Sequence, residues 1–594
     1  MHWKIQVAAI GAVALLIGCG GGGDKKQTPP ESTGVLHSKI QGVTYRTATR
    51  SGKTDANGNF KYLPGESVTF SVGGIELGSA TGAATISLFT LAGMTPPTSE
   101  LGLRRDLNRM TYVATPLSNA ANRALFLLAL DGDGNPGNGI DVSPHEAALA
   151  DAKLVFDVQH YEFAGKLSGL TPGLNNNIPM SFAIKWLYRS LGVKMAGNVP
   201  VGATTDEQND GVIDSIGRNE VDAAGDITST LIDEDADDQP DVTTTYERDS
   251  LGRITRQRTV RDLDLDRAPD SDHTVVTTYD AHGNVTRVVE QEDTDANGSI
   301  DSETVVLSTQ DAYGRQLESR LSIDTDYDGD PDILEVDTYT RDARGNLLRA
   351  LTEIDEQADG HVDTRYVSDY TWDASNRQLT SSYTRDLDGD GHIDNAWRSV
   401  ATYAASGTRQ TYGDDYDSNG DGVYEQKSLS RYGYDSAGNA TSSITDYEDT
   451  WGAYQTSGQF SYDPDRRPLS GVYSFDDLVD GTVDSVIRQN YAYDANGFQL
   501  SWEYVSEVVS TGGLGSWVDS TSYTYSAAGA ETSSMSGTDF DNDGDLELSR
   551  RTTIEYAPSN DALAQIVDQY LPALGSGPGY VGANQLLSSN GARN

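Results

Sequence analysis

Residues 293–332 read DTDANGSID SETVVLSTQ DAYGR QLESRLSI DTDYDGDPD, and this stretch decides the fold. It contains two segments rich in Thr, Val and Ser, which run from Ser302 to Gln310 and from Gln316 to Ile323. This composition is typical of β-strands. The short sequence DAYGR joins the two segments, and an acidic nine-residue motif stands on either side of them. The stretch therefore predicts an antiparallel hairpin between two kinds of turn.

Both turn motifs recur with the same period. The D-A-x-G-N turn returns every 31 residues from Asp249 to Asp435, and the acidic motif does so from Asp262 to Asp417. The later D-A-x-G-N turns follow steps of 28, 31, 32 and 31 residues. Two motifs that share one period indicate an internal repeat. The expected fold class is mainly β: an extended antiparallel β-hairpin repeat array, about 31 residues per repeat, preceded by a small β-sandwich and a short helical region.

Aromatic residues recur three and one positions before the aspartate of the D-A-x-G-N turn, as in Tyr432/Tyr434 and Tyr370/Trp372. A spacing of two places both side chains on one face of a strand. Two interpretations are open, an aromatic ladder that packs neighbouring strands together and a surface on which sugars stack. Cross-strand packing is the favoured one.

The turn sequences YDAHGNVTR (279–287) and YDSAGNATS (434–442) resemble the YD repeats of the RHS family. The resemblance implies repeated hairpins that build a long spiralling sheet, which in that family can close into a shell. This chain departs from the usual unit, because the acidic motif lengthens each repeat.

The acidic motif has the form D-x-D-x-D-G-x-x-D. Side chains at positions 1, 3, 5 and 9 supply oxygen ligands, and the glycine at position 6 permits a sharp turn. A hard cation such as Ca²⁺ takes six to eight oxygens. Thr304 and Trp397 stand where an EF-hand has its glutamate, at position 12. The motif instead resembles the nine-residue calcium loops of integrin-type propeller blades, and the expected cofactor is Ca²⁺.

Five copies carry a complete ligand set. Their candidate metal ligands are Asp293, Asp295, Asn297, Asp301, Asp324, Asp326, Asp328, Asp332, Asp386, Asp388, Asp390, Asp394, Asp417, Asn419, Asp421, Glu425, Asp539, Asp541, Asp543 and Glu547. Weaker copies, which lack a ligand or the glycine, begin at Asp206, Asp233, Asp262, Asp355 and Asp476.

The N-terminus has the sequence features of a targeting segment. Lys4 precedes an apolar run that ends at Cys19, the only cysteine of the chain. This pattern resembles a bacterial lipobox, which implies that Cys19 is lipidated. Gly20 after the cysteine implies an outer-membrane location by analogy with lipoprotein sorting, without indicating the side that the protein faces. The calcium loops favour the cell surface, because extracellular modules of this kind bind calcium only weakly. The predicted organisation is a lipoprotein signal peptide (1–18), a flexible tether (19–34), a small β-sandwich domain (35–90), a mainly helical region (91–200), YD-like calcium-loop β-repeats (201–556) and a C-terminal tail (557–594).

Three helices are expected in the second domain. Thr115-Pro116 predicts a capped start of a helix that runs to Leu130, and 181–191 predicts another. Ser143 and Glu146 match a capping box. Between the helix that ends at Leu130 and the one expected after Ser143 lies DGDGNPGNGID (131–141). It either holds a cation, through Asp131, Asp133, Asn135 and Asp141, or is a polar, glycine-rich helix–helix loop.

The amino-acid composition and the absence of known catalytic motifs limit the classes of function that we expect. Ninety acidic residues against 43 basic ones give a net charge of −47, which argues against nucleic-acid binding. The sequence contains no G-x-S-x-G, H-E-x-x-H or P-loop motif, so we expect no enzyme. The expected function is a calcium-binding surface lipoprotein whose repeats act as a rigid adhesive, binding or structural element. It is held to the membrane by its lipid anchor, with a surface glycan or protein as partner. One alternative is an RHS-like shell or scaffold that encloses or exports a partner, and another is a carbohydrate-binding or carbohydrate-degrading protein.

Overall fold

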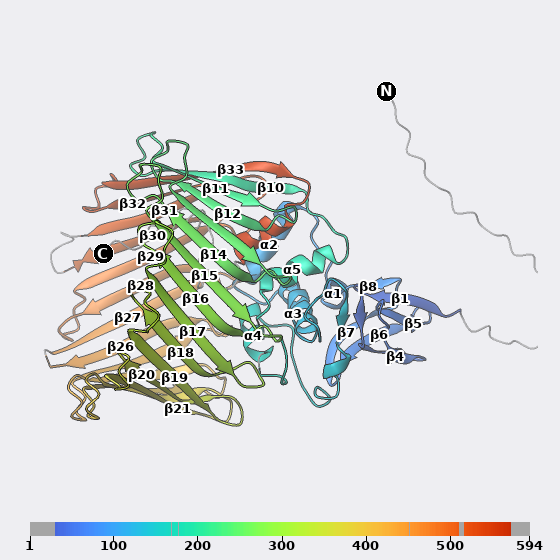
Figure 1. The fold of residues 1–594 in the computed structure, drawn as a ribbon, viewed down its shortest axis with the longest axis horizontal. Helices are drawn as coiled ribbons and strands as arrows, with labels where there is room; N and C mark the ends of the chain where they lie inside the picture. The colour runs from blue at the N-terminus through green and yellow to red at the C-terminus, as the bar shows by residue number, and fades with distance from the viewer. Residues whose placement is uncertain (1–29, 168, 176, 451, 510–515, 572–594) are drawn as a thin grey trace, which may run out of the picture.

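The structure is a computed structural model that describes residues 30–571, apart from 168, 176, 451 and 510–515 (Figure 1). A small β-domain, a group of helices and a large barrel lie side by side along the long axis of the molecule (Figure 1). Cys19 and the predicted signal peptide lie outside the described residues, so lipidation stays a prediction.

The β-domain consists of small sheets that pack together. Its strands are β1 (Ser32–Leu36), β2 (Ile40–Gln41), β3 (Thr44–Arg46), β4 (Ser51–Lys53), β5 (Asn59–Tyr62), β6 (Ser67–Val72), β7 (Ile75–Thr81) and β8 (Thr85–Ile86). One sheet has the order β5-β1-β8 and another has the order β4-β3-β6-β7. The alternation of Val68, Phe70 and Val72 predicts a strand with one buried face, and all three side chains are fully buried in β6.

The helices are α1 (Leu88–Leu91), α2 (Glu100–Met110), α3 (Pro116–Ala129), α4 (His160–Leu167), α5 (Met180–Arg189) and α6 (Leu563–Tyr570). The predicted start of α3 is confirmed, because the Thr115 hydroxyl accepts a hydrogen bond from the Ser118 amide. The capping box at Ser143 is wrong. The Asp141 carboxylate accepts the Ser143 amide, and only a short 3₁₀ helix (Ser143–His145) follows. Within the described residues, no helix is long and apolar enough to cross a bilayer.

The barrel contains 24 antiparallel strands, each hydrogen-bonded to its neighbours in sequence. They are β10 (Gly197–Asp206), β11 (Ser215–Val221), β12 (Ile227–Asp233), β13 (Val242–Arg248), β14 (Ile254–Arg261), β15 (Ser271–Tyr279), β16 (Val285–Asp293), β17 (Ser302–Gln310), β18 (Gln316–Asp324), β19 (Ile333–Arg341), β20 (Leu347–Asp355), β21 (Thr364–Trp372), β22 (Gln378–Asp386), β23 (Asn395–Tyr403), β24 (Arg409–Asp417), β25 (Gln426–Tyr434), β26 (Ala440–Asp449), β27 (Gly452–Tyr462), β28 (Pro468–Asp476), β29 (Ser485–Tyr493), β30 (Gln499–Val508), β31 (Trp517–Tyr525), β32 (Glu531–Asp539) and β33 (Leu548–Ser559). The hairpin predicted from residues 302–323 is confirmed as β17 and β18.

The expected extended array is wrong, because the sheet closes on itself. β10 pairs with β33 from Gly197–Ser559 to Asp206–Arg551. Nearly equal strand lengths and regular turns let the twist and coil of each hairpin add up until the two edges meet. Closure also satisfies the backbone groups that an open array would expose at each end. With strands about 4.8 Å apart, the perimeter corresponds to a circle at least about 37 Å across.

The two faces of the wall differ in exposure. In β23, Trp397, Ser399 and Ala401 are more buried than the alternating Arg398, Val400 and Thr402. A concave face shields its side chains more than a convex one does, so the first set faces the lumen.

Aromatic rings pack across strands on this inner face, but this series lies at other positions than the predicted pairs, which stand three and one residues before each D-A-x-G-N turn. The rings of Tyr366, Tyr383, Trp397 and Tyr416 follow one another across four strands, with centroids 6.0, 5.4 and 4.5 Å apart. The Arg385 guanidinium lies 5.2 Å from the centroid of the Trp397 ring. Because the rings pack against one another, their faces serve cross-strand contact.

The D-A-x-G-N turns lie at the barrel end that faces the helices. In the turn that begins at Asp280, one carboxylate oxygen accepts the amides of His282 and Asn284 at 2.8 and 2.9 Å, and the other accepts the Asn284 side chain. Some copies replace the asparagine by arginine. Arg467, for example, pairs with Asp463 at 2.6 Å and stacks over Tyr493. The motif therefore has a purely structural explanation.

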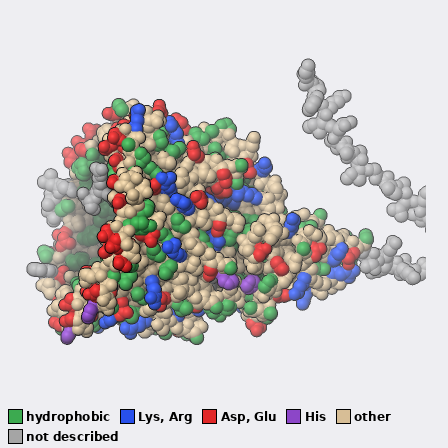
Figure 2. Space-filling view, viewed as in Figure 1, with side chains coloured by type: hydrophobic (Ala, Val, Ile, Leu, Met, Phe, Trp, Pro, Cys, Tyr) green, Lys and Arg blue, Asp and Glu red, His purple; other side chains and the backbone are tan. Residues whose placement is uncertain are grey.

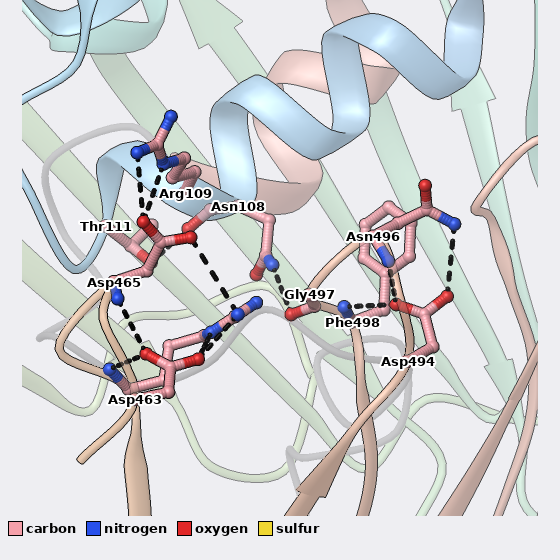
Figure 3. A network of polar contacts seen from close by, with 10 residues as sticks. Asn108, Arg109, Thr111, Asp463, Asp465, Asp494, Asn496, Gly497 and Phe498 are labelled. Atoms are coloured by element: carbon pink, nitrogen blue, oxygen red, sulfur yellow. Dashed lines mark hydrogen bonds and ion pairs between the residues drawn. The ribbon is translucent and has the colours of Figure 1, made fainter.

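Helices cover this end of the barrel and contact the turns directly. In Figure 3, Asn108 of α2 donates to the carbonyl of Gly497 at 2.7 Å, and Arg109 pairs with Asp465 at 2.9 Å. Lys185 of α5 bridges Asp226 of a barrel turn and Asp568 of α6, at 2.7 and 3.0 Å. We call α2 to α6 the helical cap.

Candidate metal centres at the barrel rim

The acidic motifs form a ring of loops at the barrel end opposite the helical cap. We call them the rim loops: residues 206–214, 233–241, 262–270, 293–301, 324–332, 355–363, 386–394, 417–425, 476–484 and 539–547. Each loop joins two consecutive strands. Figure 2 shows Asp and Glu side chains gathered along the side of the barrel away from the helices.

All ten rim loops share one backbone conformation. Positions 4 and 6 both have a positive φ, as at Ala296 (50°) and Gly298 (88°) of the loop that starts at Asp293. Position 4 is a non-glycine residue in eight loops, and even Val479 (52°) adopts the left-handed region there. A left-handed conformation costs a non-glycine residue roughly 1–2 kcal/mol. The carboxylates of the loop must therefore hold this backbone in place.

Positions 1 and 9 organise the loop through backbone amides. The Asp293 carboxylate accepts the amides of Asn297 and Gly298 at 3.1 and 2.7 Å, and Asp301 accepts the Thr294 amide at 2.7 Å. The same bonds recur in the loop at Asp324. Each bond uses one lone pair of a carboxylate oxygen. Oδ2 of Asp301 also accepts the Thr294 hydroxyl, so its Oδ1 atom and the second lone pairs of Asp293 remain for a cation.

The carboxylates converge on one point. Oxygens of Asp539, Asp541, Asp543 and Glu547 all lie within 4.8 Å of one another. The sets Asp293/Asp295/Asp301 and Asp324/Asp326/Asp332 meet the same limit. Oxygens bound to Ca²⁺ at about 2.4 Å stand at most about 4.8 Å apart, so the spacing fits one ion. Every ligand is a hard oxygen, which suits calcium better than zinc or copper.

Electrostatics within a loop favours a bound cation. The neighbouring Asp543 carboxylate raises the pKa of Asp541, and Glu547 and Asp539 add to the effect. Like charges at this spacing disfavour ionisation unless a cation neutralises them.

The two remaining complete loops differ in detail. In the loop at Asp386, that side chain is 6% exposed and its Oδ1 atom has no hydrogen-bond partner within the described part of the chain, whereas Oδ2 accepts the Gly391 amide at 3.1 Å. In the loop at Asp417, Oδ1 accepts the amides of Asn419 and Gly420. The structure thus places all twenty predicted ligands in rim loops, and their binding of metal stays a prediction.

Two weaker copies gather their carboxylates as tightly as the complete ones. Asp233/Asp235/Asp241 and Asp262/Asp264/Asp270 each meet the 4.8 Å limit. In the first of these loops, Asp237 forms an ion pair with Arg267 of the next loop. Sequence analysis missed this arginine, which stands in place of the position-6 glycine and supplies a resident positive charge. Its signal was the single basic residue within an acidic motif.

Comparisons with known proteins complete this description. No family model matches the sequence, and no curated protein matches it. A structure of the Tc holotoxin pore from Photorhabdus luminescens matches with 12% identity over 55% of this chain and 21% of that chain, with a TM-score of 0.19. A porin-like protein from Bacteroides uniformis matches with 10% identity over 51% of this chain and 96% of that one, with a TM-score of 0.19. One from Bacteroides vulgatus matches with 12% identity over 43% and 94%, with a TM-score of 0.16. The chain spans about a fifth of the toxin chain, and at these scores none of the likenesses carries an argument about function.

Proposed function

We propose that this protein is a calcium-binding, non-enzymatic surface lipoprotein whose barrel forms a rigid RHS-like shell around a partner. The observation that carries the proposal is the ring of rim loops with one shared backbone and converging carboxylates. Calcium would neutralise adjacent loops and fix the open end of the wall.

The closed sheet supports a shell more than an adhesive array. An adhesive sheet commonly offers a free edge or a long exposed face to its partner. Here both edge strands are paired with each other, the helical cap covers one end, and the wall is wide enough to leave a lumen.

Charged side chains on the outer face of the barrel favour attachment to the membrane by a lipid anchor over insertion of the barrel wall into the bilayer. Charged pairs cross neighbouring strands on this face, as between Arg398 and Asp415 at 2.8 Å and between Arg431 and Asp446. An arginine at the middle of a lipid-facing barrel costs about 2–4 kcal/mol. A water-facing barrel tethered to the outer membrane by lipidated Cys19 avoids this cost.

His37 and Ser190 form a contact of the kind that serine hydrolases use, although a carbohydrate-degrading enzyme would rely on paired carboxylates instead. His37 Nε2 lies 2.8 Å from Ser190 Oγ. However, Nδ1 of His37 accepts the Leu88 amide, which leaves the proton on Nε2. The imidazole therefore donates to Ser190 and cannot take its proton. Burial also lowers the pKa of His37 to about 3.

Element-resolved metal analysis during a calcium titration tests the proposal. Wild-type protein should bind at least the five ions of the complete loops, and Asp386→Ala with Asp390→Ala should remove one. A matched control, Asp369→Ala with Asp415→Ala, also removes two negative charges, but from the wall, and should bind as wild type does. A wild-type protein without bound calcium, or equal losses in both double variants, would contradict the calcium function.

A further inference from the structure

The loop 131–141 is a second acidic site, far from the rim. It follows α3, whose side chains are buried on all sides, and leads into the short strand β9 (Ile140–Asp141). β9 pairs in parallel with β2 of the β-domain. The loop therefore connects the central helix of the cap with the β-domain.

Asp131 is the unusual residue of this loop. Its side chain is 7% exposed, and Oδ1 accepts the Asp141 amide at 3.1 Å. Oδ2 is buried and has no hydrogen-bond partner among the described residues. A buried carboxylate oxygen without a partner loses its hydration and gains nothing in return, so its retention calls for a ligand.

The other charged residues of the loop, Asp133 and Asp141, are acidic, and Lys39 of the β-domain lies beside Gly139. Asp133 and Asp141 lie close enough to Asp131 for their negative charges to act on its carboxylate. A bound cation would relieve the repulsion between these carboxylates.

Hydrogen bonds already hold the other carboxylates in position. Asp133 accepts the Asn135 amide at 2.9 Å and the Asn138 side chain at 2.7 Å. Asp141 accepts the Ser143 amide and, from β2, the side chain of Gln41 at 3.2 Å. Asp131, Asp133 and Asp141 thus offer only hard oxygens, held by short-range bonds before any ion arrives.

We propose that loop 131–141 binds a calcium ion through the carboxylates of Asp131, Asp133 and Asp141. Oδ2 of Asp131 is the inner ligand, and the exposed Asp133 closes the site from the solvent side. The ion neutralises three carboxylates and fixes the end of α3 to the β2–β9 pair. The site is independent of the proposed rim function, because it shares no residue with a rim loop.

Hydrogen exchange measured by mass spectrometry on the full chain tests this site, because it reports each peptide separately. Calcium at ten times the dissociation constant should slow exchange through local opening about elevenfold in peptides that cover 129–142. Asp131→Asn should abolish this response and leave the rim peptides responsive. Asp388→Asn is the matched control: it alters one rim loop and should leave the response of 129–142 intact. Magnesium should substitute poorly, since it demands a smaller octahedral shell.

Several results would overturn the site and leave the rim function standing. One is a calcium response at the rim with none at 129–142 in the wild type. Another is a full response in Asp131→Asn, or a lost response in Asp388→Asn. If Asp131→Asn fails to fold, Asp133→Asn replaces it, because Asp133 is exposed and its loss leaves the core intact. A response at 129–142 alone would instead refute the rim function.

Discussion

Gly420 couples two neighbouring rim loops, and its replacement by alanine should damage both. Gly420 is position 4 of the loop 417–425, with φ 69°. A Cβ atom there would overlap the backbone carbonyl of Ile393, which belongs to the preceding loop. Gly422, two residues later, also has a positive φ (85°), but a Cβ there would meet nothing within 4 Å. Gly422→Ala is therefore a matched control that introduces backbone strain without a collision.

The magnitudes follow from these contacts. Each alanine in the left-handed region costs roughly 1–2 kcal/mol. In Gly420→Ala, the Ile393 carbonyl must also move, and with it the neighbouring Asp394. That residue donates its amide to Arg385 at 2.7 Å and accepts the Leu387 amide at 2.6 Å. At about 1 kcal/mol for each hydrogen bond, the preceding loop loses about 2 kcal/mol.

Hydrogen exchange of peptides from 386–394 and 417–425, at saturating calcium, measures the two effects separately. Gly422→Ala should accelerate exchange in 417–425 only. Gly420→Ala should also accelerate exchange in 386–394, by about 30-fold for 2 kcal/mol. If both variants leave 386–394 unchanged, neighbouring rim loops are not coupled by this contact and the reasoning fails.

Three further outcomes are expected. Removal of calcium by a chelator should clearly lower the melting temperature. At ten times the dissociation constant, calcium stabilises each site by about 1.4 kcal/mol, or roughly 7 kcal/mol for five independent sites. Equal melting curves with calcium and with chelator would show that the loops are plain acidic turns. Cys19→Ser should release the protein from membranes, and equal retention after a high-salt wash would refute the anchor. Burial raises the pKa of Glu531 to about 7, so the unfolded chain loses this proton near pH 4.5 and the folded one near 7. The free energy of unfolding should fall by up to about 3 kcal/mol as the pH rises through that window. Glu531→Gln should therefore raise the melting temperature at pH 8 but little at pH 4.5. An equal gain at both pH values would contradict the raised pKa.

Local structure was predictable from the sequence, because local chemistry determines it. The repeat located β17 and β18 to within a residue, and Thr115-Pro116 located the start of α3. The D-A-x-G-N turn was found by its spacing, and its aspartate and asparagine have a defined role in the structure, while its glycine has a positive φ, as at Gly283 (77°). The ligand set of the rim loops likewise came from the motif itself.

The closure of the sheet was not predictable in the same way. It depends on small twists summed over 24 strands and on a pairing between Asp206 and Arg551, for which no local signal exists. The shared loop conformation was equally hidden, because Leu265 and Val479 occupy a left-handed position that their side chains disfavour. The Arg267 ion pair required knowledge of which loops are neighbours.

The pairing of β10 with β33 sets the order of events during biosynthesis. A ribosome completes β10 about 350 residues before it completes β33, so the first strand waits for its partner through the synthesis of all the others. Until then the growing sheet has an unpaired strand at each edge, and such edges promote association between nascent chains. The entropic cost of bringing β10 and β33 together rises only slowly with the length of chain between them, but their pairing must wait until β33 has been synthesised. A chain that ends before residue 548 lacks β33, so it can pair β10 to β32 in order but leaves β10 and β32 as two open edges.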